Sequence, residues 1–266
     1  MNRIAAKFDE VRSRSRPGFI PFITAGDPDI ETCAEIVLKL AELGADVIEL
    51  GVPFSDPIAD GPTIQLSSQR ALEKGVNLPA ILEMTARLRT QIEIPIVLFS
   101  YLNPLINYGI KSLADDASAA GIDGVLVTDA VDEEAAAIAR IMKEGDIDLI
   151  SLIAPTTADH RLRSIANSAS GFLYAVSRAG VTGARADVSS QAENLVSRAR
   201  HVTDLPVAVG FGISTRQQIE SVWRYADAAV VGSAIVNEIS KNGTRTAVER
   251  VADFVTALVP QTFAND

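Results

Sequence analysis

Two acidic residues, Glu49 and Asp60, are the side chains of this sequence best suited to chemistry. Glu49 lies inside the apolar run Ala45–Gly51, which is typical of a short buried strand, and Asp60 closes the segment that follows. Because side chains alternate across a strand, Glu49 shares a face with Val47. A buried carboxylate is costly unless it is paired or protonated, and desolvation raises its pKa toward the range of a general acid or base. A structural carboxylate bonded to neighbouring backbone is the alternative.

Glycines near the end of the sequence indicate a phosphate site. Gly210-Phe211-Gly212 follows one apolar run, and Gly232-Ser233 follows the next. Glycines allow backbone N–H groups to approach phosphate oxygens, and a helix N-terminus adds a favourable field. The alternative is that these glycines only end strands and permit tight turns. Their occurrence after two successive runs favours phosphate binding.

Amine and metal catalysis are both disfavoured. The six lysines fall in helical or connecting segments, whereas a Schiff-base lysine is expected at a strand end. The two histidines, His160 and His201, lie in helix-like surroundings and form no cluster of metal ligands. We therefore predict no metal site, and expect acid–base chemistry by carboxylates on a phosphorylated substrate.

Eight short apolar runs alternate with helical stretches along the whole sequence. The runs are Gly18–Thr24, Asp46–Leu50, Pro95–Ser100, Gly124–Val127, Asp148–Ile153, Gly171–Val176, Pro206–Val209 and Ala226–Val231. The helical stretches include Ile30–Leu43, Leu78–Arg89, Leu113–Ala120, Glu133–Lys143 and Gln191–His201. Eight such units in about 250 residues predict an α/β fold, a parallel (β/α)8 TIM barrel. The segment Ile4–Val11 is expected to be an additional N-terminal helix that covers the bottom of the barrel.

The sequence shows no sign of division into domains. No linker, low-complexity tract or shift in composition interrupts it, so residues 1–266 are predicted to form a single (β/α)8 barrel domain. The alternative fold, a doubly wound open sheet, calls for a glycine-rich phosphate turn after its first strand. Ala25–Asp29, at that position, lacks the pattern.

Composition narrows the class of protein further. With 47% hydrophobic and 22% charged residues, the sequence is typical of a soluble globular protein. A net charge of -10 argues against binding to nucleic acid or anionic membranes. A single cysteine, Cys33, allows no disulfide framework, and neither a signal peptide nor a membrane span is evident. These features predict a cytoplasmic protein.

Four segments, in the same order, resemble the tryptophan synthase alpha subunit family. They are Pro21–Pro28, Glu49–Gly61, Ser177–Ala184 and Gly210–Ile213, and the resemblance extends over essentially the full chain. One departure is Val131, in the loop after the fourth predicted strand, where members often carry proline. The resemblance implies a lyase of tryptophan biosynthesis that cleaves indole-3-glycerol phosphate, by a retro-aldol reaction, to indole and glyceraldehyde 3-phosphate.

The resemblance also implies roles for individual residues. Glu49 is the acid and base at the reacting carbons, and Asp60 accepts a hydrogen bond from the indole nitrogen. The implied substrate-binding residues are Phe22, Ile64, Tyr101, Tyr174, Thr182, Gly183, Phe211, Gly212, Gly232 and Ser233. Phe99 and Leu126 are further pocket candidates, for which a place in the core is a strong alternative. The segment Ser177–Ser189 is expected to close over the site and bring Thr182 to Asp60.

A partner is implied as well: a pyridoxal-phosphate β subunit that consumes indole, in an α2β2 assembly. Its expected contacts are Pro53, Asp56, Asn103 and Pro104, although Asp56 is equally well explained as a solvated loop carboxylate. No cofactor is expected in this chain, because it has no lysine at a strand end to bind pyridoxal phosphate. The alternatives are a stand-alone indole-3-glycerol-phosphate lyase, a non-catalytic activator of a β subunit, and an unrelated phosphosugar isomerase barrel.

Overall fold

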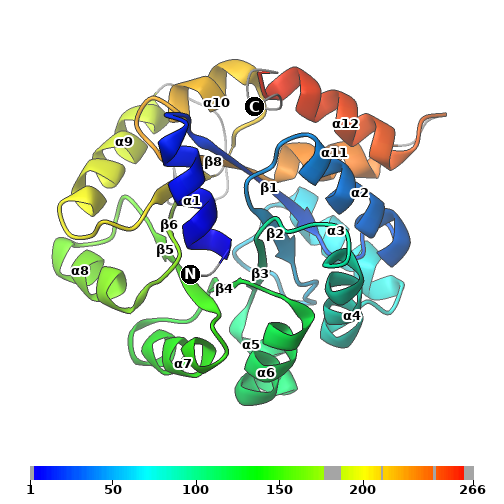
Figure 1. Ribbon diagram of the computed structural model, residues 1–266, viewed down its shortest axis with the longest axis horizontal. Helices are drawn as coiled ribbons and strands as arrows, with labels where there is room; N and C mark the ends of the chain where they lie inside the picture. Colours follow the sequence, from blue (N-terminus) through cyan, green and yellow to red (C-terminus); the bar gives the residue numbers. More distant parts are fainter. Residues whose placement is uncertain (1–2, 177–186, 211, 242–243, 261–266) are drawn as a thin grey trace.

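The protein forms a closed barrel of eight parallel strands in sequence order, with helices packed around it (Figure 1). The computed structural model describes residues 3–176, 187–210, 212–241 and 244–260. The strands are β1 Gly18–Thr24, β2 Ile48–Gly51, β3 Ile96–Ser100, β4 Gly124–Val127, β5 Asp148–Ile153, β6 Leu173–Val176, β7 Val207–Gly210 and β8 Ala228–Val231. The predicted (β/α)8 barrel is confirmed, and β1, β4 and β5 have the predicted bounds.

Twelve helices lie in the described part of the chain. They are α1 Arg3–Ser13, α2 Ile30–Glu42, α3 Pro62–Glu73, α4 Leu78–Leu88, α5 Leu102–Tyr108, α6 Ile110–Ala120, α7 Asp132–Glu144, α8 Asp159–Ser168, α9 Asp187–Arg200, α10 Arg216–Val222, α11 Ser233–Ser240 and α12 Ala247–Leu258. The five predicted helical stretches correspond to α2, α4, α6, α7 and α9. The additional N-terminal helix is α1.

Side chains of the barrel separate into an outer and an inner apolar layer. Ile48 and Leu50 belong to the outer layer between strands and helices, whereas Val47 belongs to the inner one. This is the predicted alternation. Helix α1 closes one end of the barrel (Figure 1), where Phe8 packs on Phe172 with ring centroids 5.5 Å apart. Because this end is filled, the opposite end, where the strands finish, is left for a site.

The same hydrogen bond, from a backbone N–H to a side chain, recurs between neighbouring strands at the end of the barrel that α1 covers. On β1, β3, β5 and β7, one backbone N–H donates to the side chain of a residue just before the next strand. The four pairs are Phe19 with Asp46, Ile96 with Asp123, Leu149 with Ser170, and Val207 with Asp227. In each pair the second residue's N–H donates back to the carbonyl of the first. This bond explains why β2 begins two residues after the predicted start at Asp46.

We expect Asp123→Ala to lower the free energy of unfolding by about 3 kcal/mol, the usual scale for breaking a buried charged pair. The buried Asp123 carboxylate accepts bonds from Arg3 at 3.1 Å and Arg89 at 2.6 Å, besides the Ile96 N–H. Urea unfolding measures the loss. In the control, Asp115→Ala removes an exposed partner of Lys111 and should cost less than about 1 kcal/mol. Equal losses would contradict the buried bonding.

Candidate active site

Glu49 points into the barrel. Its neighbours in strand register are Phe22 on β1 and Val97 on β3, and both belong to the inner apolar layer. The Glu49 carboxyl is fully buried, and neither oxygen has a hydrogen-bond partner among the described residues. A structural carboxylate at such depth is normally bonded to backbone or side-chain donors. The geometry therefore favours a functional carboxyl over the structural alternative.

Burial sets the protonation state of Glu49. Desolvation raises the pKa of this carboxyl to about 8, because the charged form is penalised where no donor stabilises it. The pKa lies above neutrality, so the group is mostly protonated at pH 7. Glu49 can therefore deliver a proton to a bound molecule.

Asp60 is held in the loop between β2 and α3, and its side chain is half-buried. The Tyr101 hydroxyl donates to Asp60 Oδ2 at 3.1 Å. Burial raises the pKa of Asp60 to about 6, and the bond from Tyr101 opposes that rise. Near pH 7 Asp60 is therefore mostly ionised while Glu49 is mostly protonated. The site holds one acid and one anionic acceptor.

Aromatic rings gather near Glu49 in the inner layer of the barrel. Phe22 and Phe99 meet edge to face at 5.2 Å, and Phe99 meets Tyr174 at 6.3 Å. Burial raises the pKa of the Tyr174 hydroxyl well above its usual value, and the nearby charges of Glu49 and Asp60 raise it further. Two more predicted lining residues, Ile64 and Leu126, are buried in the same inner layer.

Two glycines make room for these rings, a role that the sequence interpretation missed. A Cβ on Gly51 would lie 2.5 Å from Phe22 Cζ, and one on Gly210 would lie 2.1 Å from Tyr174 Oη. Gly51 follows Glu49 by two residues and so faces the same side of β2. A glycine at an inward-facing position near the end of a strand is the sequence signal that a neighbouring ring packs against the backbone there. Side chains at these positions would push the rings into the site.

The predicted phosphate-binding residues lie after β7 and β8. Gly212 has φ +79°, which favours glycine, and a Cβ there would meet nothing within 4 Å. Gly232 precedes α11, whose first residue, Ser233, is exposed and whose start has no side-chain cap. The uncapped N–H groups of α11 suit an anion. A Cβ on Gly232 would lie 3.3 Å from Phe22 Cδ1, so this region borders the aromatic rings.

The other predicted site residues are placed less centrally or lie outside the described residues. Thr182, Gly183 and Phe211 are outside them, as is most of the segment Ser177–Ser189. Among the predicted partner contacts, the exposed residues are Asp56 and Asn103, Pro104 is half-buried, and Pro53 is buried. Pro53 therefore shapes its loop more than it offers a contact surface.

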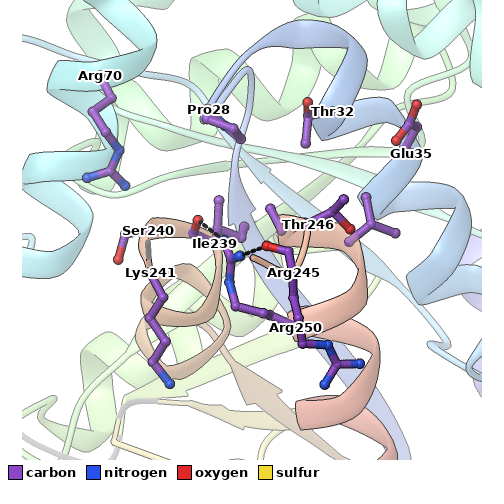
Figure 2. Close-up of a pocket in the computed structure, with 12 residues that line it drawn as sticks. Pro28, Thr32, Glu35, Arg70, Ile239, Ser240, Lys241, Arg245, Thr246 and Arg250 are labelled. Atoms are coloured by element: carbon purple, nitrogen blue, oxygen red, sulfur yellow. Dashed lines mark hydrogen bonds between the residues drawn. The ribbon is translucent and has the colours of Figure 1, made fainter. Parts of the chain in front are cut away.

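A pocket of about 470 Å³ lies away from the carboxyl groups, among residues of α2, α3, α11 and α12 (Figure 2). Its basic side chains are bonded within the chain. Arg70 pairs with Asp27, Arg245 with Asp253, and Lys241 with Glu238, while Arg250 donates to backbone carbonyls. Neither Glu49 nor Asp60 lines this pocket, so it is separate from the chemistry described above.

No group of three or more His, Cys, Asp and Glu is placed to hold a metal ion within the described ranges. No helix in the described part of the chain is long and apolar enough to cross a membrane.

Fold and site together define a (β/α)8 barrel that holds one protonated and one ionised carboxyl group near pH 7. The family model for the tryptophan synthase alpha chain matches residues 8–262. The chain is 49% identical to the tryptophan synthase alpha chain of Geobacter sulfurreducens over 97% of this chain and 98% of that one. Its identity to that of Prochlorococcus marinus is 43%, over 96% and 91% of the two chains.

Solved structures agree with the sequence matches. Tryptophan synthase subunit alpha from Legionella pneumophila superposes with a TM-score of 0.90 at 32% identity, covering 99% of this chain and 98% of that one. A structure of Mycobacterium tuberculosis tryptophan synthase gives 0.88 at 34% identity, over 97% and 96% of the two chains. The chain belongs to the tryptophan synthase alpha chain family. It is a lyase with the alpha-subunit role in tryptophan biosynthesis.

Proposed function

We propose that Glu49 and Asp60 carry out the reaction of this lyase, the retro-aldol cleavage of indole-3-glycerol phosphate to indole and glyceraldehyde 3-phosphate. The different protonation states of the two carboxyl groups, one protonated and one ionised near pH 7, support this assignment. Burial raises the pKa of Glu49 to about 8 and that of Asp60 to about 6, so an acid and a carboxylate coexist between these values. Cleavage needs one of each.

The chemistry proceeds in two proton transfers. Glu49 protonates indole C3, which places positive charge on the ring nitrogen, and the Asp60 carboxylate accepts a hydrogen bond from that N–H. The Glu49 carboxylate then takes the proton of the hydroxyl beside the breaking carbon–carbon bond. The electrons of that bond return to the ring, the aldehyde is released, and Glu49 is again protonated. No water is consumed.

The rest of the site holds the substrate. The indole ring is placed between Phe22 and Tyr174, with Ile64 and Tyr101 completing the apolar walls. The phosphate is assigned to the backbone near Gly212, Gly232 and Ser233, where the α11 N-terminus favours an anion. Thr182, Gly183 and Phe211 belong to the same proposal on the strength of the family resemblance.

We expect Gly212→Val to weaken the binding of glycerol phosphate by at least about 10-fold, because valine is strained at positive φ and blocks the close approach of a ligand to the backbone. Calorimetric titration measures the affinity. Gly75→Val is the matched control, since Gly75 has φ +76° and open space around a Cβ but lies at the far end of α3. The assignment is wrong if both variants bind the phosphate equally well.

Family membership implies a complex with a beta subunit. We propose an α2β2 assembly, with pyridoxal phosphate in the β subunit and none in this chain, in the cytoplasm. Docking is assigned to the loop after β2, which carries Asp56, and to helix α5, which carries Asn103 and Pro104. Two large apolar side chains stand exposed there, Ile58 at 85% and Ile106 at 57%. Exposed apolar surface next to a site supports an interface.

Indole release from indole-3-glycerol phosphate tests the proposed function. The purified chain is assayed alone and with a beta subunit, and we expect release in both cases with a higher rate in the complex. An unchanged rate would favour a stand-alone lyase. No release by the chain, together with activation of the beta subunit, would favour a non-catalytic activator and overturn the proposal.

A further inference from the structure

One hydroxyl group makes two bonds to the loop that carries Asp60. The Tyr101 hydroxyl accepts from the Ala59 N–H at 2.9 Å and donates to Asp60 Oδ2 at 3.1 Å. A tyrosine hydroxyl has a single hydrogen. Because an N–H can only donate, that hydrogen is committed to Asp60. The two bonds therefore fix the direction of donation, and Asp60 is held as an acceptor.

Tyr101 is itself rigidly placed. It is 4% exposed and stands at the N-cap of α5, and the following N–H, that of Leu102, donates to Asp129 at 2.7 Å. Its ring packs on Phe54, with centroids 5.2 Å apart. The phenol thus connects the loop after β2 to a helix start anchored by the loop after β4. Such support is what a precise site requires, because packing and neighbouring bonds lock the rotamer.

We propose that Tyr101 is a positioning residue of the cleavage reaction, whose hydroxyl orients Asp60 toward the indole nitrogen and stabilises its carboxylate form. The inference rests on the function proposed above. The bond occupies Oδ2, and Oδ1 has no hydrogen bond to any described residue, so Oδ1 is available to the ring N–H. The backbone of Asp60 has further support, since Gln65 Nε2 donates to the Asp60 carbonyl at 2.9 Å. Tyr101 thus acts on the Asp60 side chain directly and on the loop backbone through the Ala59 N–H.

The ionisable groups around this pair set the direction of the expected effect. Asp60 faces the Tyr101 hydroxyl, and it lies near enough to Tyr174, together with Glu49, to raise the Tyr174 pKa. Burial raises the Tyr101 pKa, and the charges of Asp60 and Asp129 add to the rise, so its hydroxyl stays protonated and able to donate. The Tyr101 bond lowers the pKa of Asp60, against the effect of burial. Removing the hydroxyl therefore raises the Asp60 pKa and disfavours the carboxylate at low pH.

The test is the pH dependence of kcat/KM for indole release by wild type and Tyr101→Phe. Phenylalanine keeps the ring and its packing and removes only the hydroxyl. We expect the acid limb to move to higher pH by about one unit, with roughly 5-fold lower activity at pH 6 and little loss at pH 8. In an Asp60→Asn background the same change should have little further effect, because the two groups act together.

Tyr108→Phe is the matched control. Tyr108 also donates from its hydroxyl to a carboxylate, that of Asp116 at 2.6 Å, but on the surface at the far end of α5. Its pH profile should match the wild type. An active wild type whose acid limb is unmoved by Tyr101→Phe overturns the inference and leaves the proposed function intact. A wild type that releases no indole overturns the proposed function itself.

Discussion

Glu49→Gln is expected to lower the turnover number for indole release by at least about 10²-fold while substrate binding is retained. Glutamine has nearly the size of the protonated carboxyl but cannot transfer a proton to indole C3 or take one from the hydroxyl. The Glu49 side chain is fully buried, and its carboxyl has no hydrogen-bond partner among the described residues. No described group is therefore bonded to this carboxyl that could transfer the proton in its place. Single-turnover kinetics and calorimetry separate chemistry from binding.

The same substitution should not damage the fold. The folded-state pKa of Glu49, about 8, lies above its ordinary value of 4.5, so the folded protein holds a proton that the unfolded chain loses in this range. Glu49 therefore reduces stability progressively as pH rises from about 4.5 to about 8. Urea unfolding at pH 8 should show Glu49→Gln to be at least as stable as wild type. Glu73→Gln, at the exposed end of α3, is the control and should keep full turnover. Near-normal turnover in a folded Glu49→Gln variant contradicts the assignment.

Asp60→Asn is expected to cost about 10²-fold in kcat, with a small change in KM. Asparagine keeps the shape and an acceptor oxygen, but it lacks the charge that stabilises a developing cation, and removing one such group typically costs 10²–10³. The acid limb of the pH profile should disappear with it, because that limb reports the ionisation of Asp60. Steady-state kinetics from pH 5.5 to 9 measures both effects.

Asp116→Asn is the matched control for this substitution. Asp116 also accepts a hydrogen bond from a tyrosine, Tyr108, but it is exposed on α6 and far along the chain from the site. It should change neither kcat nor the acid limb. If Asp60→Asn behaves like Asp116→Asn, Asp60 does not interact with the reacting ring.

Local sequence patterns were sufficient to predict the barrel and the orientation of Glu49. Val47 and Glu49 alternate with Ile48 and Leu50, and this alternation indicates the two faces of a strand. Eight short apolar runs along the sequence indicate the eight strands of the barrel. The sequence analysis gives no bounds for helices α3 and α12, although Pro62 at a helix start and the capping box of Thr246 with Glu249 are readable signals. Short α5, with no side-chain cap bond, offers a weaker signal.

Contacts between distant segments could not be predicted from local pattern. The bond from Tyr101 to Asp60 joins two loops 41 residues apart, and it depends on the register of β2 and β3 and on where α5 begins. The lack of partners around Glu49 likewise depends on what every neighbouring strand presents to it. For the same reason, the spaces at Gly51 and Gly210 emerge only when the rings of Phe22 and Tyr174 are in place.

The pH dependence of kcat/KM for indole release by the wild-type chain tests the central claim most directly, namely that a protonated Glu49 and an ionised Asp60 act together. We predict a bell-shaped profile with an acid limb near pH 6, where Asp60 becomes protonated, and an alkaline limb near pH 8, where Glu49 loses its proton. Activity that is constant from pH 5 to 9.5, or that continues to rise above pH 8, would contradict it.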